Sequence, residues 1–176
     1  MLMRVLSVTV TLLLLMTLVV AQQSSKTNSL DDLRFLIGDW EGVGEGGPGA
    51  GKGVFSFAFD LQNKAIIRKN YAEYPATANR PRVRHDDLMV IYLDAVSHQI
   101  RANYFDSEGQ QISYQVTPSS DNEMVTFLSQ PSGSQPRYRL SYKKLKDGML
   151  GGKFEIAPPG QPEAFKTYLE WSGRRK

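Results

Sequence analysis

Residues 55–61 read Phe55-Ser56-Phe57-Ala58-Phe59-Asp60-Leu61, with a large apolar side chain at every second position. Successive side chains of a β-strand point to opposite faces, so this alternation predicts a strand with one apolar face and one polar face. The same period recurs from Asp39 to the end of the chain and is interrupted by turn residues roughly every eight to twelve positions. Such spacing is typical of a β-sandwich or a β-barrel.

Only one segment carries helix signals. Ser29 is a suitable N-cap, Asp31 and Asp32 follow in the first turn, and Gly38 is a suitable terminator. We therefore expect an all-β fold, an up-and-down antiparallel β-barrel of about 9–10 strands with one short N-terminal helix. The scarcity of helices, the sequential hairpins and the absence of cysteine favour this barrel over an immunoglobulin-like sandwich.

Two finer expectations concern the end of the chain. The pair Gly151-Gly152 predicts a bulge or a sharp bend in the strand that carries it. The last strand is expected to place four side chains on one inner face, namely Phe165, Thr167, Leu169 and Trp171.

Residues 1–21 have the pattern of a secretory signal peptide. Arg4 precedes an uncharged apolar run over residues 5–20, and Ala21 is a compact residue at the expected cleavage position. An uncleaved membrane anchor is the alternative. Residues 22–28 are polar and are expected to form a disordered leader. In both cases the globular part is exported, to the periplasm or the medium, and no later stretch is long and apolar enough to span a membrane.

Composition restricts the remaining functions. The chain has 176 residues, a formal net charge of +3 and no cysteine, so residues 29–176 fit one domain without disulfides, thiolate metal ligands or a thiol nucleophile. Lysine and arginine are scattered among acidic residues, so we expect no nucleic-acid partner. No Gly-x-Ser-x-Gly or His-Glu-x-x-His motif is present, so we assign no catalytic residue, and the sequence favours a binding protein over the open alternative of a small esterase or isomerase.

The segment Phe35-Leu36-Ile37-Gly38-Asp39-Trp40-Glu41-Gly42-Val43-Gly44-Glu45-Gly46 resembles the Gly-x-Trp opening of the calycins, the lipocalin-like β-barrels. Its extended form is similar to the nitrobindin-like branch and to an exported bacterial family of unknown function, which residues 86–92 and 104–109 also resemble. The resemblance implies that Trp40 plugs the closed end of a barrel. It also implies that a basic side chain of the last strand stacks on Trp40, and we assign Arg174 to this role, with Arg175 as the alternative.

The resemblance to nitrobindin-like proteins implies haem binding only if the histidine that ligates haem in those proteins is present here. That ligand lies in a late strand, whereas the histidines of this chain are His85 and His98, both before the midpoint. The haem ligand is therefore not carried over. A haem-binding or metal-binding barrel stays open as an alternative function.

The inner faces of the expected strands predict an aromatic cavity. Rings supply contact area and phenols orient a polar group, which suits a small hydrophobic or amphiphilic ligand. The alternative is that the rings simply fill the interior. The residues assigned to ligand binding are Phe57, Phe59, His98, Tyr104, Tyr114, Tyr138, Tyr142 and Trp171.

The two histidines have separate expectations. His98 is placed on the strand face of Ile100 and Tyr104, where it could orient a ligand. His85 is expected in a solvated loop, or in a weak metal site if it faces Asp86 or Asp87; we assign no metal ligand.

Two further expectations concern the surface of the barrel, a lid and a partner patch. The glycine-rich segment 42–53 lacks the ending of a phosphate loop and is interpreted as a lid beside the barrel opening. A partner surface or homodimer is the other alternative function, through an exposed apolar patch of Met89, Ile91, Leu93, Phe105 and Tyr168.

Overall fold

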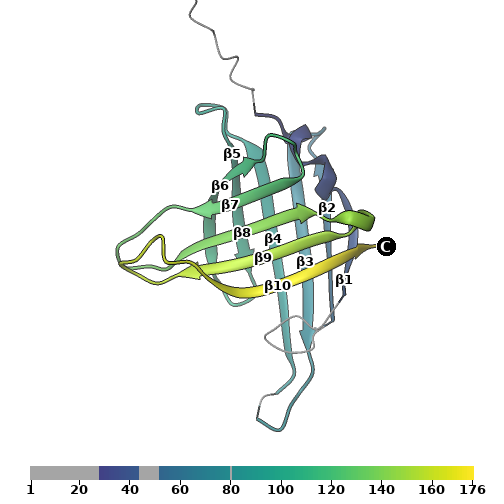
Figure 1. Ribbon diagram of the computed structural model, residues 1–176, viewed down its shortest axis with the longest axis vertical. Coiled ribbons are helices and arrows are strands. Elements are labelled where there is room, and N and C mark those ends of the chain that lie inside the picture. Colours follow the sequence, from purple (N-terminus) through teal and green to yellow (C-terminus); the bar gives the residue numbers. More distant parts are fainter. Residues whose placement is uncertain (1–27, 44–51, 80) are drawn as a thin grey trace, which may run out of the picture.

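The computed structural model describes residues 28–43, 52–79 and 81–176, which form a closed antiparallel β-barrel (Figure 1). The predicted all-β, up-and-down barrel is confirmed: each strand pairs with its neighbours in sequence, and the first pairs with the last. The strands are β1 (Gly38–Val43), β2 (Lys52–Asp60), β3 (Ala65–Tyr74), β4 (Val83–Leu93), β5 (Ile100–Asp106), β6 (Gln111–Pro118), β7 (Met124–Ser129), β8 (Arg137–Lys144), β9 (Leu150–Ala157) and β10 (Lys166–Arg175). Two short 3₁₀ helices accompany them, η1 (Leu30–Leu36) and η2 (Lys146–Gly148).

Several expectations lie wholly or partly outside the described residues. They are the signal peptide over residues 1–21, the leader except for Asn28, and the central part of the glycine-rich lid, residues 44–51. Within the described residues, no helix is long and apolar enough to cross a membrane.

The connections alternate between the two ends of the barrel because every strand reverses direction (Figure 1). Helix η1 lies with the β4–β5 and β6–β7 connections: Asn28 Nδ2 donates to the His98 carbonyl oxygen at 3.3 Å, and Asn122 Nδ2 donates to Asp32 Oδ1 at 3.1 Å. We call this the closed end. The opposite, open end carries the β3–β4, β5–β6, β7–β8 and β9–β10 connections.

Helix η1 covers the closed end. Ser29 begins it with a capping box, in which Ser29 Oγ accepts from the Asp31 N–H and Asp32 Oδ2 accepts from the Ser29 N–H, each at 3.1 Å. Leu33 and Leu36 are fully buried beneath it. The predicted helix is therefore present, in 3₁₀ form, and Ile37 alone separates it from β1.

The helix ends at Leu36 with Ile37 as its C-cap, and Gly38 follows the cap with a positive φ of +141°, as the first residue of β1. A Cβ at this position would lie 2.2 Å from Arg175 Nη1. Glycine is favoured here because residues with a Cβ rarely adopt this positive φ, whereas the guanidinium group at the end of the Arg175 side chain could shift.

Trp40 is buried at the closed end, as the Gly-x-Trp opening implies. Its Nε1 donates to the Leu36 carbonyl oxygen at 2.8 Å, and Arg175 Cζ lies 4.6 Å from the centre of its ring. Arg175 pairs directly with Trp40 across β1 and β10, whereas Arg174 is exposed and pairs with Glu41. The assignment of Arg174 is wrong by one residue, because adjacent side chains of a strand point to opposite faces.

The outer apolar patch also needs correction. Met89 and Ile91 are fully buried, so they face the interior and not a partner. The run Leu88 to Leu93 is apolar at every position, so its period could not assign the faces. Only Leu93, Phe105 and Tyr168 of the predicted patch are exposed.

The end of the chain differs from both expectations made for it. Strand β9 is regular at Gly151 and Gly152, and the irregularity lies in β10, between Thr167 and Leu169. This bulge shifts the faces of β10, so Phe165 is half-buried and stacks under the outer-face Arg139 guanidinium, 4.1 Å from Cζ. Gly152 leaves room for Trp171, whose ring would lie 2.2 Å from a Cβ there.

Candidate ligand-binding cavity

The open half of the barrel contains a cavity of about 660 Å³. Its aromatic lining comes mainly from strands β6 and β8–β10: Tyr114, Tyr138, Phe154, Tyr168 and Trp171, joined by Phe55 of β2. The charged lining comes mainly from β3, β4 and the β5–β6 turn: Arg68, His85, Asp87, Asp106 and Glu108. In the strand order of the closed barrel, β4 lies opposite β9. An aromatic wall therefore faces a polar wall.

The residues assigned to ligand binding fall into three groups. Tyr104, Tyr114, Tyr138 and Trp171 line the cavity. Phe57 and Tyr142 are buried below it, where their rings meet edge to face at 5.3 Å between centroids, so they pack the closed half. Phe59 lies at the end of β2 under the Arg34 guanidinium, 5.0 Å from its ring centre.

His98 does not continue the strand face of Ile100. It is exposed in the β4–β5 connection at the closed end, with a left-handed φ of 54°, and it is absent from the cavity lining. The strand begins only at Ile100, two residues later than the alternation suggested.

The base of the polar wall is a buried ion pair between Arg68 and Asp87, which contact each other directly and have 6% and 4% of their side chains exposed. Asn70 Nδ2 also donates to Asp87 Oδ2, at 2.9 Å. Burial by itself lowers the pKa of Arg68, but the Tyr142 hydroxyl and the Asp87 carboxylate outweigh it and raise that pKa. Burial opposes ionisation of Asp87, yet Arg68 and His85 hold its pKa below the ordinary value. Both groups are therefore charged at neutral pH.

One donor of this pair is not used. Among the described residues, Arg68 Nε and the Tyr142 hydroxyl are buried and form no hydrogen bond of ordinary geometry. They are close enough for the phenol to raise the pKa of Arg68.

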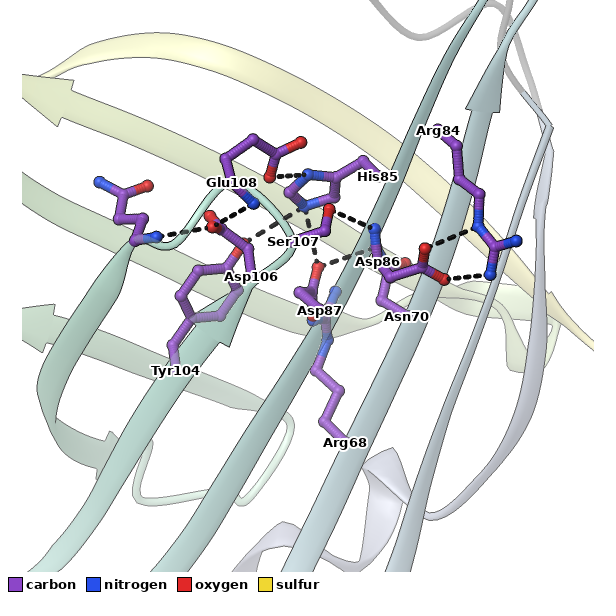
Figure 2. A network of polar contacts seen from close by, with 11 residues as sticks. Arg68, Asn70, Arg84, His85, Asp86, Asp87, Tyr104, Asp106, Ser107 and Glu108 are labelled. Carbon is purple, nitrogen blue, oxygen red and sulfur yellow. Dashed lines mark hydrogen bonds and ion pairs between the residues drawn. The ribbon is translucent and has the colours of Figure 1, made fainter.

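Above the pair, His85 connects β4 to the β5–β6 turn, as Figure 2 shows. Its Nε2 lies 3.3 Å from Asp87 Oδ2 and 3.3 Å from the Tyr104 hydroxyl, and its Nδ1 lies 2.8 Å from Glu108 Oε2. The hydrogen bond with Asp87 is the largest cause that raises the pKa of His85, to about 9. His85 is therefore an inward-facing strand residue and not the solvated loop residue expected from the sequence.

The polar wall is what the sequence reasoning missed, apart from Tyr104. The available signal was the alternation Val83, His85, Asp87, Met89, Ile91, which places two charged side chains on the face that is buried farther along β4. Recognising it required the correct assignment of Met89 to the interior.

The histidines do not fit an axial haem ligand. His98 lies outside the cavity lining, and both ring nitrogens of His85 already contact side chains of the polar wall. In the part of the chain that the structure describes, a histidine of the cavity could therefore bind an ion only in exchange for a side-chain contact of the polar wall.

No protein-family model matches the chain, and no curated protein matches it either. The fold and the two walls of the cavity are therefore the features that indicate the function.

Proposed function

We propose that this protein is an exported, lipocalin-like binding protein that holds a small amphiphilic molecule inside its barrel. The cavity carries the proposal. Its volume of about 660 Å³ falls within the range of roughly 300–1,000 Å³ that small-molecule sites occupy. The Trp40 opening and residues 1–21 support the calycin resemblance and export, respectively.

The two walls indicate the chemical class of the ligand. Tyr138 and Phe154 stack with an interplanar angle of 7° and present a flat aromatic surface from β8 and β9. Arg68, Asn70 and Tyr104 present hydrogen-bonding groups from β3 and β5. A molecule with an apolar or planar body and a polar group that accepts a hydrogen bond matches both surfaces.

The position of the two tryptophans provides a direct test. Trp171 lines the cavity, whereas Trp40 is buried at the closed end. The purified protein is titrated with dibromostearate, an amphiphile whose bromine atoms quench tryptophan fluorescence at short range. We expect saturable quenching in the wild type and a much smaller fractional loss in Trp171→Phe, where Trp40 is the remaining tryptophan.

Two outcomes would contradict this proposal. Quenching that does not saturate would mean that no defined site exists. Equal fractional quenching in wild type and Trp171→Phe would place the amphiphile away from the cavity. Native mass spectrometry of protein from an exporting host adds an independent readout, because a retained ligand appears as a discrete added mass and export predicts an N-terminus at Gln22.

A further inference from the structure

We propose that His85, Asp106 and Glu108 form a binding site for a divalent transition-metal ion at the rim of the cavity. Zn²⁺ is the probe that tests this site. This inference goes beyond the proposed amphiphile and does not depend on it. One nitrogen or oxygen atom of each residue lies within 4.8 Å of those of the other two. Metal bonds of about 2.0–2.2 Å to nitrogen and oxygen at tetrahedral angles place ligand atoms roughly 3.4 Å apart, so side-chain movements on the order of 1 Å complete the site.

The imidazole is already oriented as a metal ligand would be. Its Nε2 contacts Asp87 Oδ2 at 3.3 Å, and Asp87 is fixed from below by Arg68 and Asn70. A histidine that binds a metal ordinarily donates its other ring N–H to a carboxylate, which fixes the tautomer and the ring orientation. With Nε2–H on Asp87, Nδ1 is the atom that a metal ion would bind; without the ion, Nδ1 contacts Glu108 Oε2 at 2.8 Å, where its N–H donates to the carboxylate.

The turn that carries the two carboxylates is held in place independently (Figure 2). Asp106 Oδ1 accepts from the backbone N–H groups of Glu108 and Gln110, at 3.1 and 2.8 Å. The Ser107 N–H donates to the Asp86 carbonyl oxygen at 2.9 Å, which ties the turn to β4. Asp106 Oδ2 is left facing Tyr104, at 3.3 Å, on the side of His85.

The charges of the polar wall favour a cation at this place. Once a metal ion displaces the imidazole proton, one positive group, Arg68, accompanies the carboxylates of Asp87, Asp106 and Glu108, so these side chains have a formal charge of 1 − 3 = −2. A divalent ion neutralises it. One imidazole and two carboxylates form a mixed nitrogen and oxygen set, which suits zinc, manganese or nickel better than the all-oxygen preference of magnesium and calcium.

The competing explanation is an ion pair alone, in which a proton on His85 occupies the place of the metal. The two explanations are separated by calorimetric titration of the chelator-stripped, purified protein with Zn²⁺ at neutral pH. We expect one Zn²⁺ per chain in the wild type. Glu108→Gln, an isosteric change in an exposed turn, should weaken binding by at least the roughly 10–100-fold that loss of an outer partner costs.

Two matched variants control for adventitious binding. His98→Gln removes the other histidine, and Glu123→Gln removes an exposed glutamate of the β6–β7 connection at the closed end. Both should keep the wild-type affinity. Mn²⁺ supplies a second readout, because a bound paramagnetic ion should broaden the backbone amide signals of residues 106–110 and leave those of residues 94–99 unchanged.

Each contrary result overturns the proposal. Absence of stoichiometric Zn²⁺ binding by the wild type leaves only the ion pair. Unchanged affinity in Glu108→Gln, or loss of binding in His98→Gln, places the ion elsewhere. His85→Gln is informative only if its circular dichroism matches the wild type, and Glu108→Gln decides the question in any case.

Discussion

The two ends of strand β4 show how differently the halves of this barrel are built. Toward the closed end its inward side chains are Met89 and Ile91, both fully buried among apolar neighbours. Toward the open end they are Asp87 and His85, which join a polar network on the cavity wall. One strand thus packs the core with one half of its inner face and lines the cavity with the other. The apolar core and the proposed binding site therefore use different residues of this strand.

The largest expected effect is at the closed end. Trp40→Ala removes a buried ring that stacks on Phe55 and donates to the Leu36 carbonyl, so we expect the free energy of unfolding to fall by about 3–5 kcal/mol. Trp171→Ala, at the cavity wall, should cost clearly less because part of that ring borders open space. Urea unfolding measures both. Equal losses would mean that the open half is packed as tightly as the closed half.

The next effect lies where the halves meet. Asp87→Asn leaves the Arg68 guanidinium buried without its carboxylate, and we expect a loss of about 3 kcal/mol in the free energy of unfolding. The double variant Arg68→Met, Asp87→Leu removes both charges and should recover at least half of that loss. The same urea experiment applies. Losses that simply add across the single and double variants would show that the two groups are not coupled.

A smaller difference separates the two arginines at the end of β10. Arg175→Gln removes the contact with the Trp40 ring and a hydrogen bond of 2.9 Å to the Ile37 carbonyl, which together are worth about 1–2 kcal/mol. Arg174→Gln removes only an exposed pair with Glu41 and should change stability by about 0–0.5 kcal/mol. Thermal unfolding of the two variants side by side tests the assignment, and the reverse order would restore Arg174 as the closing residue.

The last effect is at the open end and depends on pH. The folded-state pKa of His85, about 9, lies above its ordinary value of 6.5, so the protonated ring stabilises the metal-free fold fully below pH 6.5. That contribution is lost as pH rises from 6.5 through about 9. The difference in unfolding free energy between wild type and His85→Gln should therefore shrink over this interval. A difference independent of pH would mean that His85 acts through packing alone.

The fold was predictable because its signal is local. Alternation in segments such as Phe55 to Phe59, with short turns between them, is sufficient to indicate an up-and-down barrel. The Gly-x-Trp opening placed Trp40 correctly, but Arg174 and Arg175 could not be separated until the register of β1 and β10 was known.

The site was less predictable because it depends on strand faces and on pairing. Because residues 88–93 of β4 are all apolar, their pattern does not show which side chains point inward. A bulge in β10 places Phe165 on the face opposite to the expected one. The contact of Arg68 with Asp87 joins two strands whose register is invisible in the sequence. Aromatic positions were therefore found more readily than the charged ones opposite them.

The pairing of β1 with β10 also bears on how the chain folds. Every other pairing joins consecutive strands, whereas Trp40 and Arg175 meet only after nearly the whole domain is in place. The entropy lost on closing a loop increases with its length, so this pairing should form last. Until it does, β1 and β10 each present an open edge that another chain can join. The stacking of Arg175 on Trp40 stabilises this last pairing. We therefore expect it to limit aggregation of the folding chain as well as to stabilise the finished barrel.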